Sequence, residues 1–262
     1  MRETLNNPKI KNMEQQFIYS LNTKLVKAHV VKRPSAYIKS PYVADIEIDG
    51  VAYLGHTPSL GCCGLVEAGC AVWVIETKGT KCQYRILFAN HREEKDGVVH
   101  DSIIGVAPKL AEQIVLNSLS ENLFDFLDVD TFKSEQSIQQ SRFDFVGSET
   151  DGTHFIMEVK NVPLADYVDC PAKERKSMDF STYPFTQKVS YFPDGYRKTK
   201  TAPVSERALK HINHLREIKE SEPSLRTILL FVIQRSDSEY MQPSVIDPTY
   251  REAVIKAHEA GV

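Results

Sequence analysis

RFDFVGSETDGTHFIMEVKN, residues 142–161, is the stretch that decides the fold expected for this chain. Two apolar runs flank a polar loop that contains Asp151-Gly152, a pair typical of β-hairpin turns. Asp144 nevertheless interrupts the first run, and Glu158 and Lys160 interrupt the second. Charged side chains are seldom buried without a partner, so this hairpin is expected to carry a site as well as part of the core.

The spacing of the two acids predicts their geometry. In a hairpin centred on Asp151, Asp144 lies seven residues before the centre and Glu158 seven after it. A symmetric hairpin then places the two side chains opposite each other, with Cβ atoms about 5 Å apart. Two ionised carboxylates at that distance repel, so a shared proton, a cation or a divalent metal must compensate. Lys160 follows on the same face, about 7 Å along the strand.

The same alternation assigns the neighbouring apolar side chains to faces. Phe143 and Phe145 are expected on one face of the first strand, and Asp144 and Val146 on the other. In the second strand, Phe155, Met157 and Val159 are expected on one face, away from Glu158.

The acids and the lysine allow two interpretations. Asp, Glu and Lys on adjacent strands are the residues needed for metal-assisted phosphodiester hydrolysis, in which carboxylates hold Mg²⁺ and the lysine orients or deprotonates the attacking water. The alternative is a solvated hairpin face with a cross-strand Glu/Lys arrangement. Glu135, just upstream, is either a third metal ligand or a solvated loop acid.

The whole chain has the composition of a soluble globular protein, with 262 residues, 42% of them hydrophobic and 26% charged. A net charge of −3 excludes a polycation, so any nucleic-acid site must be a local basic patch. No apolar run reaches the roughly 20 residues of a membrane span, and no signal-peptide core is visible. Five cysteines without paired spacing argue against a disulfide framework. We therefore expect an intracellular protein, cytoplasmic in the simplest case, with no membrane partner.

The pattern divides the chain near residue 100. A polar lead-in at 1–22 precedes an all-β domain at 23–100, a small barrel or sandwich whose Asp49-Gly50 pair predicts a hairpin. Residues 101–262 are predicted to form an α/β or α+β domain. Its expected elements are a helix at 107–122, the hairpin, an irregular surface stretch at 163–202, a helix at 204–220, a strand at 226–233 and a helix at 248–260, the last with Asp247 as N-cap.

Basic residues suggest where a nucleic acid would bind. Arg207, Lys210, His211 and His214 recur at helical spacing on the flank of the 204–220 helix, either as a phosphate-binding stripe or as a solvated basic face. In the β domain, the adjacent pair Lys32 and Arg33 is a further candidate. The aromatic residues that could stack on bases there, or belong to the core, are Tyr37, Tyr42, Tyr53 and Trp73.

Three segments in order resemble one family. FKSEQSIQQSRFDFVGSETDGTHFIMEVKNVPL at 132–164, YFPDG at 191–195 and SERALKHINHL at 205–215 resemble the sugar fermentation stimulation protein A (SfsA) family, and the likeness extends from about residue 25 to the end. The resemblance implies an N-terminal OB-like β-barrel joined to a restriction-endonuclease-like domain of the PD-(D/E)xK fold, and it implies DNA binding.

By this resemblance each motif residue takes a role. Asp144, Glu158 and Lys160 match the nuclease-like core, and Glu135 matches the acid that precedes it. Arg207, Lys210 and His211 match the family's Arg-x-x-Lys-His. The departures from the family pattern are Ser59 and Leu60 in the barrel, Ala107, Pro108 and Glu112 near the domain junction, and insertions at 166–190 and 196–202.

The function expected from residues and resemblance together is a nuclease that uses Mg²⁺, or Mn²⁺, on DNA in preference to RNA. The second hypothesis is a non-catalytic DNA-binding protein linked to the regulation of sugar utilisation. The third is a structural module, which an exposed Glu158 and Lys160 far from Asp144 would favour.

Overall fold

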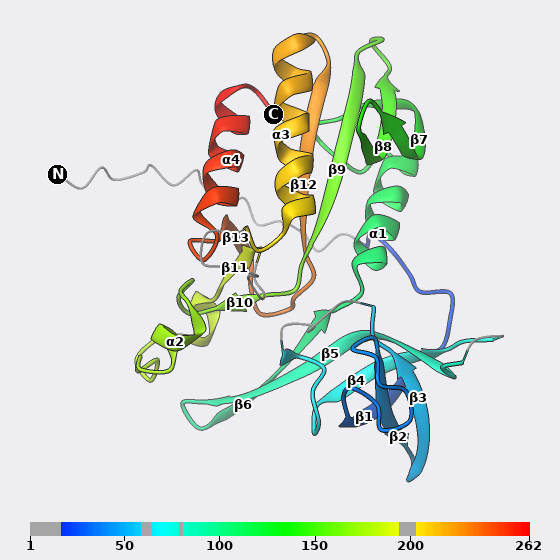
Figure 1. Cartoon of the computed structure of the whole chain (residues 1–262), viewed down its shortest axis with the longest axis vertical. Coiled ribbons are helices and arrows are strands. Elements are labelled where there is room, and N and C mark those ends of the chain that lie inside the picture. Colours follow the sequence, from blue (N-terminus) through cyan, green and yellow to red (C-terminus); the bar gives the residue numbers. More distant parts are fainter. Residues whose placement is uncertain (1–16, 59–63, 79–80, 194–202) are drawn as a thin grey trace.

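The computed structural model describes residues 17–58, 64–78, 81–193 and 203–262 (Figure 1). Most of the lead-in at 1–22, the barrel departures Ser59 and Leu60, and the basic insertion at 196–202 lie outside the described residues.

The N-terminal part is a six-stranded sheet. Its strand order is β3-β2-β1-β4-β5-β6. Strand β3 also pairs with β5, so the first five strands form a closed ring. The bounds are β1 Val26–Lys32, β2 Val43–Ile48, β3 Val51–His56, β4 Ala71–Glu76, β5 Tyr84–Lys95 and β6 Val98–Gly105. The predicted Asp49-Gly50 turn is confirmed, because both residues have positive φ between the antiparallel strands β2 and β3.

Strand β6 has no counterpart among the strands expected from the sequence. It begins after the Asp96-Gly97 turn and runs to Gly105, paired with β5 along its whole length. The chain then enters α1 at Pro108, so β6 leads from the N-terminal sheet into the helix that packs on the second sheet.

The C-terminal part contains a second sheet, ordered β12-β9-β8-β7, between helices (Figure 1). The hairpin strands β8 and β9 are antiparallel, and β12 is parallel to β9. The bounds are α1 Pro108–Ser120, β7 Val129–Ile138, β8 Ser141–Glu149, β9 His154–Val162, α3 Glu206–Ser221, β12 Arg226–Ile233 and α4 Pro248–Glu259. The expected order of helix, hairpin, helix, strand and helix is therefore confirmed, and Asp247 caps α4 by accepting the Tyr250 N–H.

Both faces of this sheet are buried, as β9 shows. Phe155, Met157 and Val159 pack in one cluster with the apolar face of α1. Ile156, on the other face, packs with Leu215 of α3. Two-sided burial explains why the strand is apolar on both faces and why a carboxylate within it requires a partner.

The alternation predicted for the first strand is wrong at Phe143. This ring belongs to the α3-side cluster with Val146, whereas Phe145 belongs to the α1-side cluster. Glu135 on β7 lies across from Asp144, between the pairs Ser134–Phe145 and Gln136–Phe143. Its φ of +55° distorts the ladder beside Asp144.

Residues 166–190 are mostly exposed or partly exposed and contain only short elements, as expected for an irregular surface stretch, but they also pack on the N-terminal sheet. They contain α2 Ala172–Arg175 and η2 Phe185–Gln187, beside a small sheet of β10 Ala165–Asp166, β11 Val189–Phe192 and β13 Tyr240–Pro243. The Phe185 ring stacks on His100 of β6, and Lys95 of β5 donates to the Phe180 carbonyl. The segment therefore ties the two sheets together. None of the helices within the described ranges is both long and apolar enough to cross a membrane.

Candidate functional site

The hairpin has the register that the sequence predicts. Phe145 pairs with Met157 and Val146 with Ile156, so the hairpin is centred on Asp151, and continuing the register puts Asp144 opposite Glu158. The Asp151 carboxylate accepts the Thr153 N–H at 2.8 Å and closes the turn.

Asp144 marks the point where the two strands separate. Its Oδ2 accepts the backbone N–H of Val159 at 2.7 Å, and the ladder between β8 and β9 stops at Phe145, the neighbour of Asp144 on the side of the turn. A carboxylate thus takes the place of a backbone acceptor, which satisfies the Val159 N–H and leaves a second carboxylate oxygen for other partners.

Glu158 is buried, with 3% of its surface exposed, at the centre of a polar group. Its Oε1 binds both Lys160 Nζ and His211 Nδ1, the latter at 2.5 Å from α3. Its Oε2 is buried and has no hydrogen-bond partner among the described residues. An unpartnered oxygen on a buried carboxylate is costly, so Oε2 is an acceptor that a cation or a water would stabilise.

The two carboxylates respond differently to their surroundings. Burial, followed by the charge of Glu158, raises the pKa of Asp144 to about 6. Burial also acts to raise the pKa of Glu158, but hydrogen bonds from His211 and Lys160 outweigh it and lower that pKa. The repulsion predicted between the two carboxylates is therefore relieved in two ways. Lys160 neutralises Glu158, and the raised pKa of Asp144 favours its protonated, uncharged form.

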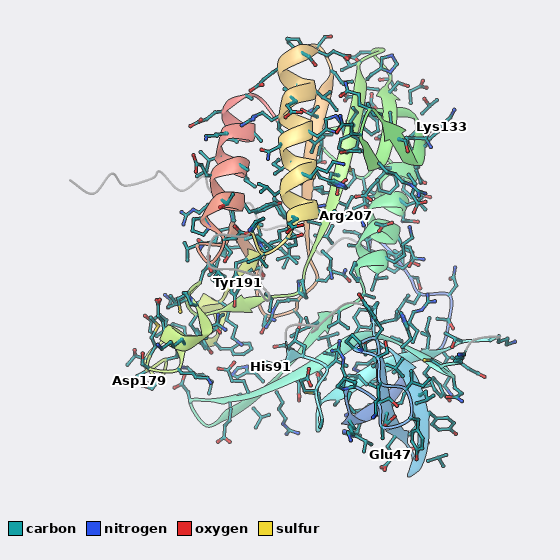
Figure 2. All side chains as sticks on the ribbon, in the orientation of Figure 1. Glu47, His91, Lys133, Asp179, Tyr191 and Arg207 are labelled. Atoms are coloured by element: carbon teal, nitrogen blue, oxygen red, sulfur yellow. The ribbon has the colours of Figure 1, made fainter. Side chains whose placement is uncertain are left out.

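These residues line a cavity of about 410 Å³ between β9 and the start of α1 and α3. Asp144, Glu158 and Lys160 share its wall with two charged residues from the helices, Glu112 and Arg207. Figure 2 shows Arg207 at the start of α3, where it is exposed. The charge of Glu112 also acts to raise the pKa of Asp144. Glu112 is therefore a third acid of the site, although the sequence indicated only that it differs from the family pattern.

Other predicted site residues lie elsewhere. Glu135 is not part of the cavity wall, and its exposed carboxylate pairs with Lys109 and Arg142. Arg33 donates twice to the Pro41 carbonyl and only 4% of its side chain is exposed.

The remaining basic candidates are exposed. Lys32 is the last residue of β1 and is exposed. It does not line the cavity. Lys210 on α3 is exposed as well, and its Nζ donates to the Gln140 carbonyl at 2.8 Å.

The two histidines of α3 do not form a solvated basic stripe. His211 and His214 are buried against Phe143, with ring centroids 6.1 and 5.6 Å from the phenylalanine ring. The signal was present in the sequence, because His211 stands three residues after Ala208 and four before Leu215, on the apolar face of the helix. A histidine in that position faces the sheet and therefore reaches Glu158.

The donor set fits a hard divalent cation. Asp144 and Glu158 supply carboxylate oxygens, including the unpartnered Oε2, and Mg²⁺ commonly binds through one or two carboxylates with water and phosphate oxygens. Within the described ranges, no three His, Cys, Asp or Glu side chains are grouped closely enough to hold a metal by themselves. A cation held here would need oxygens of substrate or water to complete its coordination.

Comparison with known proteins gives three consistent matches. The model for the sugar fermentation stimulation protein RE domain matches residues 107–262. The sugar fermentation stimulation protein homolog of Alteromonas mediterranea is 29% identical over 231 residues, which cover 84% of this chain and 82% of that protein. The homolog of Clostridium tetani is 26% identical over 241 residues, 90% of this chain and 86% of the other.

A solved structure also matches most of the chain. Pyrococcus furiosus SfsA in complex with Ca²⁺ superposes with a TM-score of 0.69 at 17% identity, covering 95% of this chain and 89% of that one. At this identity the likeness establishes a common fold.

Proposed function

This chain belongs to the sugar fermentation stimulation protein family, and from that premise we propose that Asp144, Glu158 and Lys160 form a metal-dependent nuclease site that hydrolyses phosphodiesters in DNA. The observation that carries the proposal is the buried Glu158, which has one oxygen bound by Lys160 and His211 and the other without a partner beside Asp144.

The proposal extends to the two folds. We assign the ring of β1 to β5 to an OB-like barrel, supported by the β3–β5 pairing, and residues 107–262 to the PD-(D/E)xK fold, supported by the hairpin β8–β9 and the parallel strand β12. OB-like barrels commonly hold nucleic-acid strands, which agrees with a substrate that reaches both sheets.

The metal would be held by Asp144 and Glu158. A bound Mg²⁺ or Mn²⁺ polarises a phosphoryl oxygen and acidifies water. The Ca²⁺ in the Pyrococcus furiosus SfsA complex supports a divalent site in this fold.

The chain's own residues have separate tasks. His211 and Lys160 bind Glu158 Oε1 and so fix the orientation of the carboxylate. Lys160 Nζ orients the attacking water and stabilises negative charge on the phosphate. Arg207, exposed at the rim, contacts the phosphate backbone.

A cleavage assay tests this assignment. Labelled single- and double-stranded DNA and RNA are incubated with the protein in Mg²⁺, Mn²⁺ or EDTA, beside the variants Glu158→Gln and Lys160→Met. Glu220→Gln, an exposed change on α3, is the matched control. We expect metal-dependent cleavage that both site variants lose and the control retains.

Two results would contradict the proposal. Cleavage that survives in both site variants would place the activity elsewhere. DNA binding without cleavage in any metal would instead support the second hypothesis, a non-catalytic DNA-binding protein linked to sugar utilisation.

A further inference from the structure

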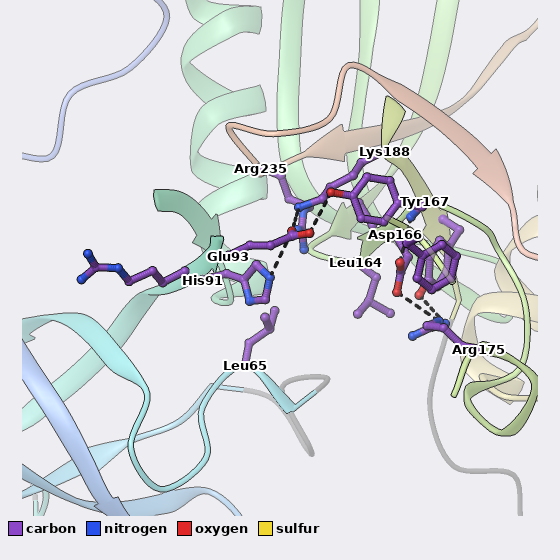
Figure 3. Close-up of a pocket in the computed structure, with 13 residues that line it drawn as sticks. Leu65, His91, Glu93, Leu164, Asp166, Tyr167, Arg175, Lys188 and Arg235 are labelled. Atoms are coloured by element: carbon purple, nitrogen blue, oxygen red, sulfur yellow. Dashed lines mark hydrogen bonds and ion pairs between the residues drawn. The ribbon is translucent and has the colours of Figure 1, made fainter. Parts of the chain in front are cut away.

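A second cavity of about 410 Å³ lies between the N-terminal sheet and the segment that follows β9 (Figure 3). Leu65, His91 and Glu93 come from the N-terminal side, and Asp166 and Arg175 face them from the other. Leu164 and Tyr191 line both this cavity and the site cavity, so the two are neighbours.

Part of the wall is flat and apolar. Tyr167 stacks on Phe180 with ring centroids 5.5 Å apart and an interplanar angle of 27°. Leu65 and Leu164 supply aliphatic surface around the same space. Lys95 Nζ and Lys188 Nζ also lie over the Tyr167 ring, 5.0 and 5.4 Å from its centroid. The surface left for the face of a nucleobase is therefore that of Phe180, Leu65 and Leu164.

The rim offers hydrogen-bond donors and acceptors side by side. Asp166 and Arg175 form an ion pair at 3.0 Å, and 22% and 24% of their side chains remain exposed. His91, with 43% of its side chain exposed, presents imidazole nitrogens from the facing strand. Mixed donors and acceptors match the edge of a base better than they match a simple anion.

The cations deeper in the wall are already neutralised. Lys188 Nζ binds Glu93 at 2.6 Å and Asp237 at 3.1 Å, and Arg235 binds both oxygens of Asp237. Tyr167 donates its hydroxyl to Glu93 at 2.7 Å. These buried contacts link β5 to the C-terminal part of the chain and neutralise Lys188 and Arg235. Of the described cations that line the cavity, the exposed Arg92 is the one that forms no ion pair.

We propose that this pocket holds the base of the nucleotide next to the phosphodiester bound by Asp144, Glu158 and Lys160. The inference rests on the proposed function and adds to it a substrate class, namely a strand in which that base is unpaired and unstacked. Single strands and strand ends satisfy this condition without the cost of opening a duplex.

Binding without turnover tests the inference. The affinity of a single-stranded DNA of about 12 nucleotides is measured by fluorescence anisotropy in EDTA at about 50 mM salt. Each nucleotide in turn is replaced by an abasic unit, and a free nucleoside 5′-monophosphate is titrated separately. For the wild type we expect one position at which loss of the base weakens binding about tenfold.

Two variants occupy or alter the pocket. Ala165→Phe adds a ring at a residue that lines the cavity, and Ala68→Phe, an exposed position outside it, is the control. In Ala165→Phe the intact strand should bind as weakly as the abasic strand, with no further loss on removing the base. Asp166→Asn keeps the size of the rim residue and provides a second comparison if the phenylalanine variant does not fold.

The outcomes separate this inference from the proposed function. Equal affinity for intact and abasic strands at every position, with cleavage retained, overturns the pocket assignment alone. Tighter binding of the free monophosphate than of the strand overturns the strand assignment. No binding of any nucleic acid at low salt overturns both proposals.

Discussion

Replacing Asp144 by Asn removes a carboxylate that the folded protein holds in an unfavourable place. Burial and the neighbouring Glu158 raise the pKa of Asp144 from 3.8 to about 6. One pKa unit corresponds to about 1.4 kcal/mol, so the full shift would cost about 3 kcal/mol when Asp144 is ionised. Because the site opens into a cavity, solvent screening reduces the expected cost to about 2 kcal/mol.

The sign of the effect depends on pH. An acid whose pKa is raised by folding binds its proton more tightly in the folded state, so its contribution to stability is complete below the unfolded pKa near 3.8 and is lost as pH rises through about 6. Asn carries no charge at any of these pH values and can still accept the Val159 N–H. Asp144→Asn should therefore match the wild type near pH 4 and exceed it by about 2 kcal/mol at pH 8.

Thermal unfolding in EDTA measures this difference. For a chain of this size, about 2 kcal/mol corresponds to a rise in Tm of about 4–8 °C at pH 8. Asp130→Asn, an exposed acid on β7 of the same sheet, is the control and should show no such trend. A difference between Asp144→Asn and wild type that does not change with pH, or a loss of stability at pH 8, would refute the reasoning.

Three further predictions concern other parts of the molecule. His211→Asn should weaken Mn²⁺ binding about tenfold, measured by electron paramagnetic resonance, because the histidine fixes Glu158 rather than binding the metal; unchanged affinity would contradict this. Gly147→Ala should lower the free energy of unfolding by about 2–3 kcal/mol in urea melts, because the new Cβ would meet the Thr131 carbonyl oxygen, and a neutral effect would show that β7 can shift. Lys188→Met should cost about 3 kcal/mol in the same melts, since it leaves buried Asp237 with one cation fewer; a smaller loss than for the exposed Lys256→Met would count against the buried network.

The local elements of the C-terminal part could be read from sequence because their signals are local. The hairpin follows from Asp151-Gly152 between apolar runs, and α4 follows from its Asp247 cap and Pro248. The pairing of Phe145 with Met157, next to Asp144 and Glu158, also follows, because a hairpin centre sets the register of both strands.

Contacts between distant segments could not be read in this way. The short strands β10, β11 and β13 have little pattern of their own, and they form a sheet because residues far apart in sequence meet. The packing of residues 166–190 on β5 and β6 likewise depends on long-range contacts such as the one between His100 and Phe185.

The sequence by itself determined the hairpin and the acids and lysine that it carries, because strand alternation and turn chemistry act over a few residues. Only the tertiary structure decided what surrounds them. In the folded chain His211 binds Glu158, and Glu112 lines the cavity. Glu135 pairs instead with Lys109 and Arg142. The physical reason is that the angle at which α1 and α3 cross the sheet is set by packing of the whole core, which no single segment encodes.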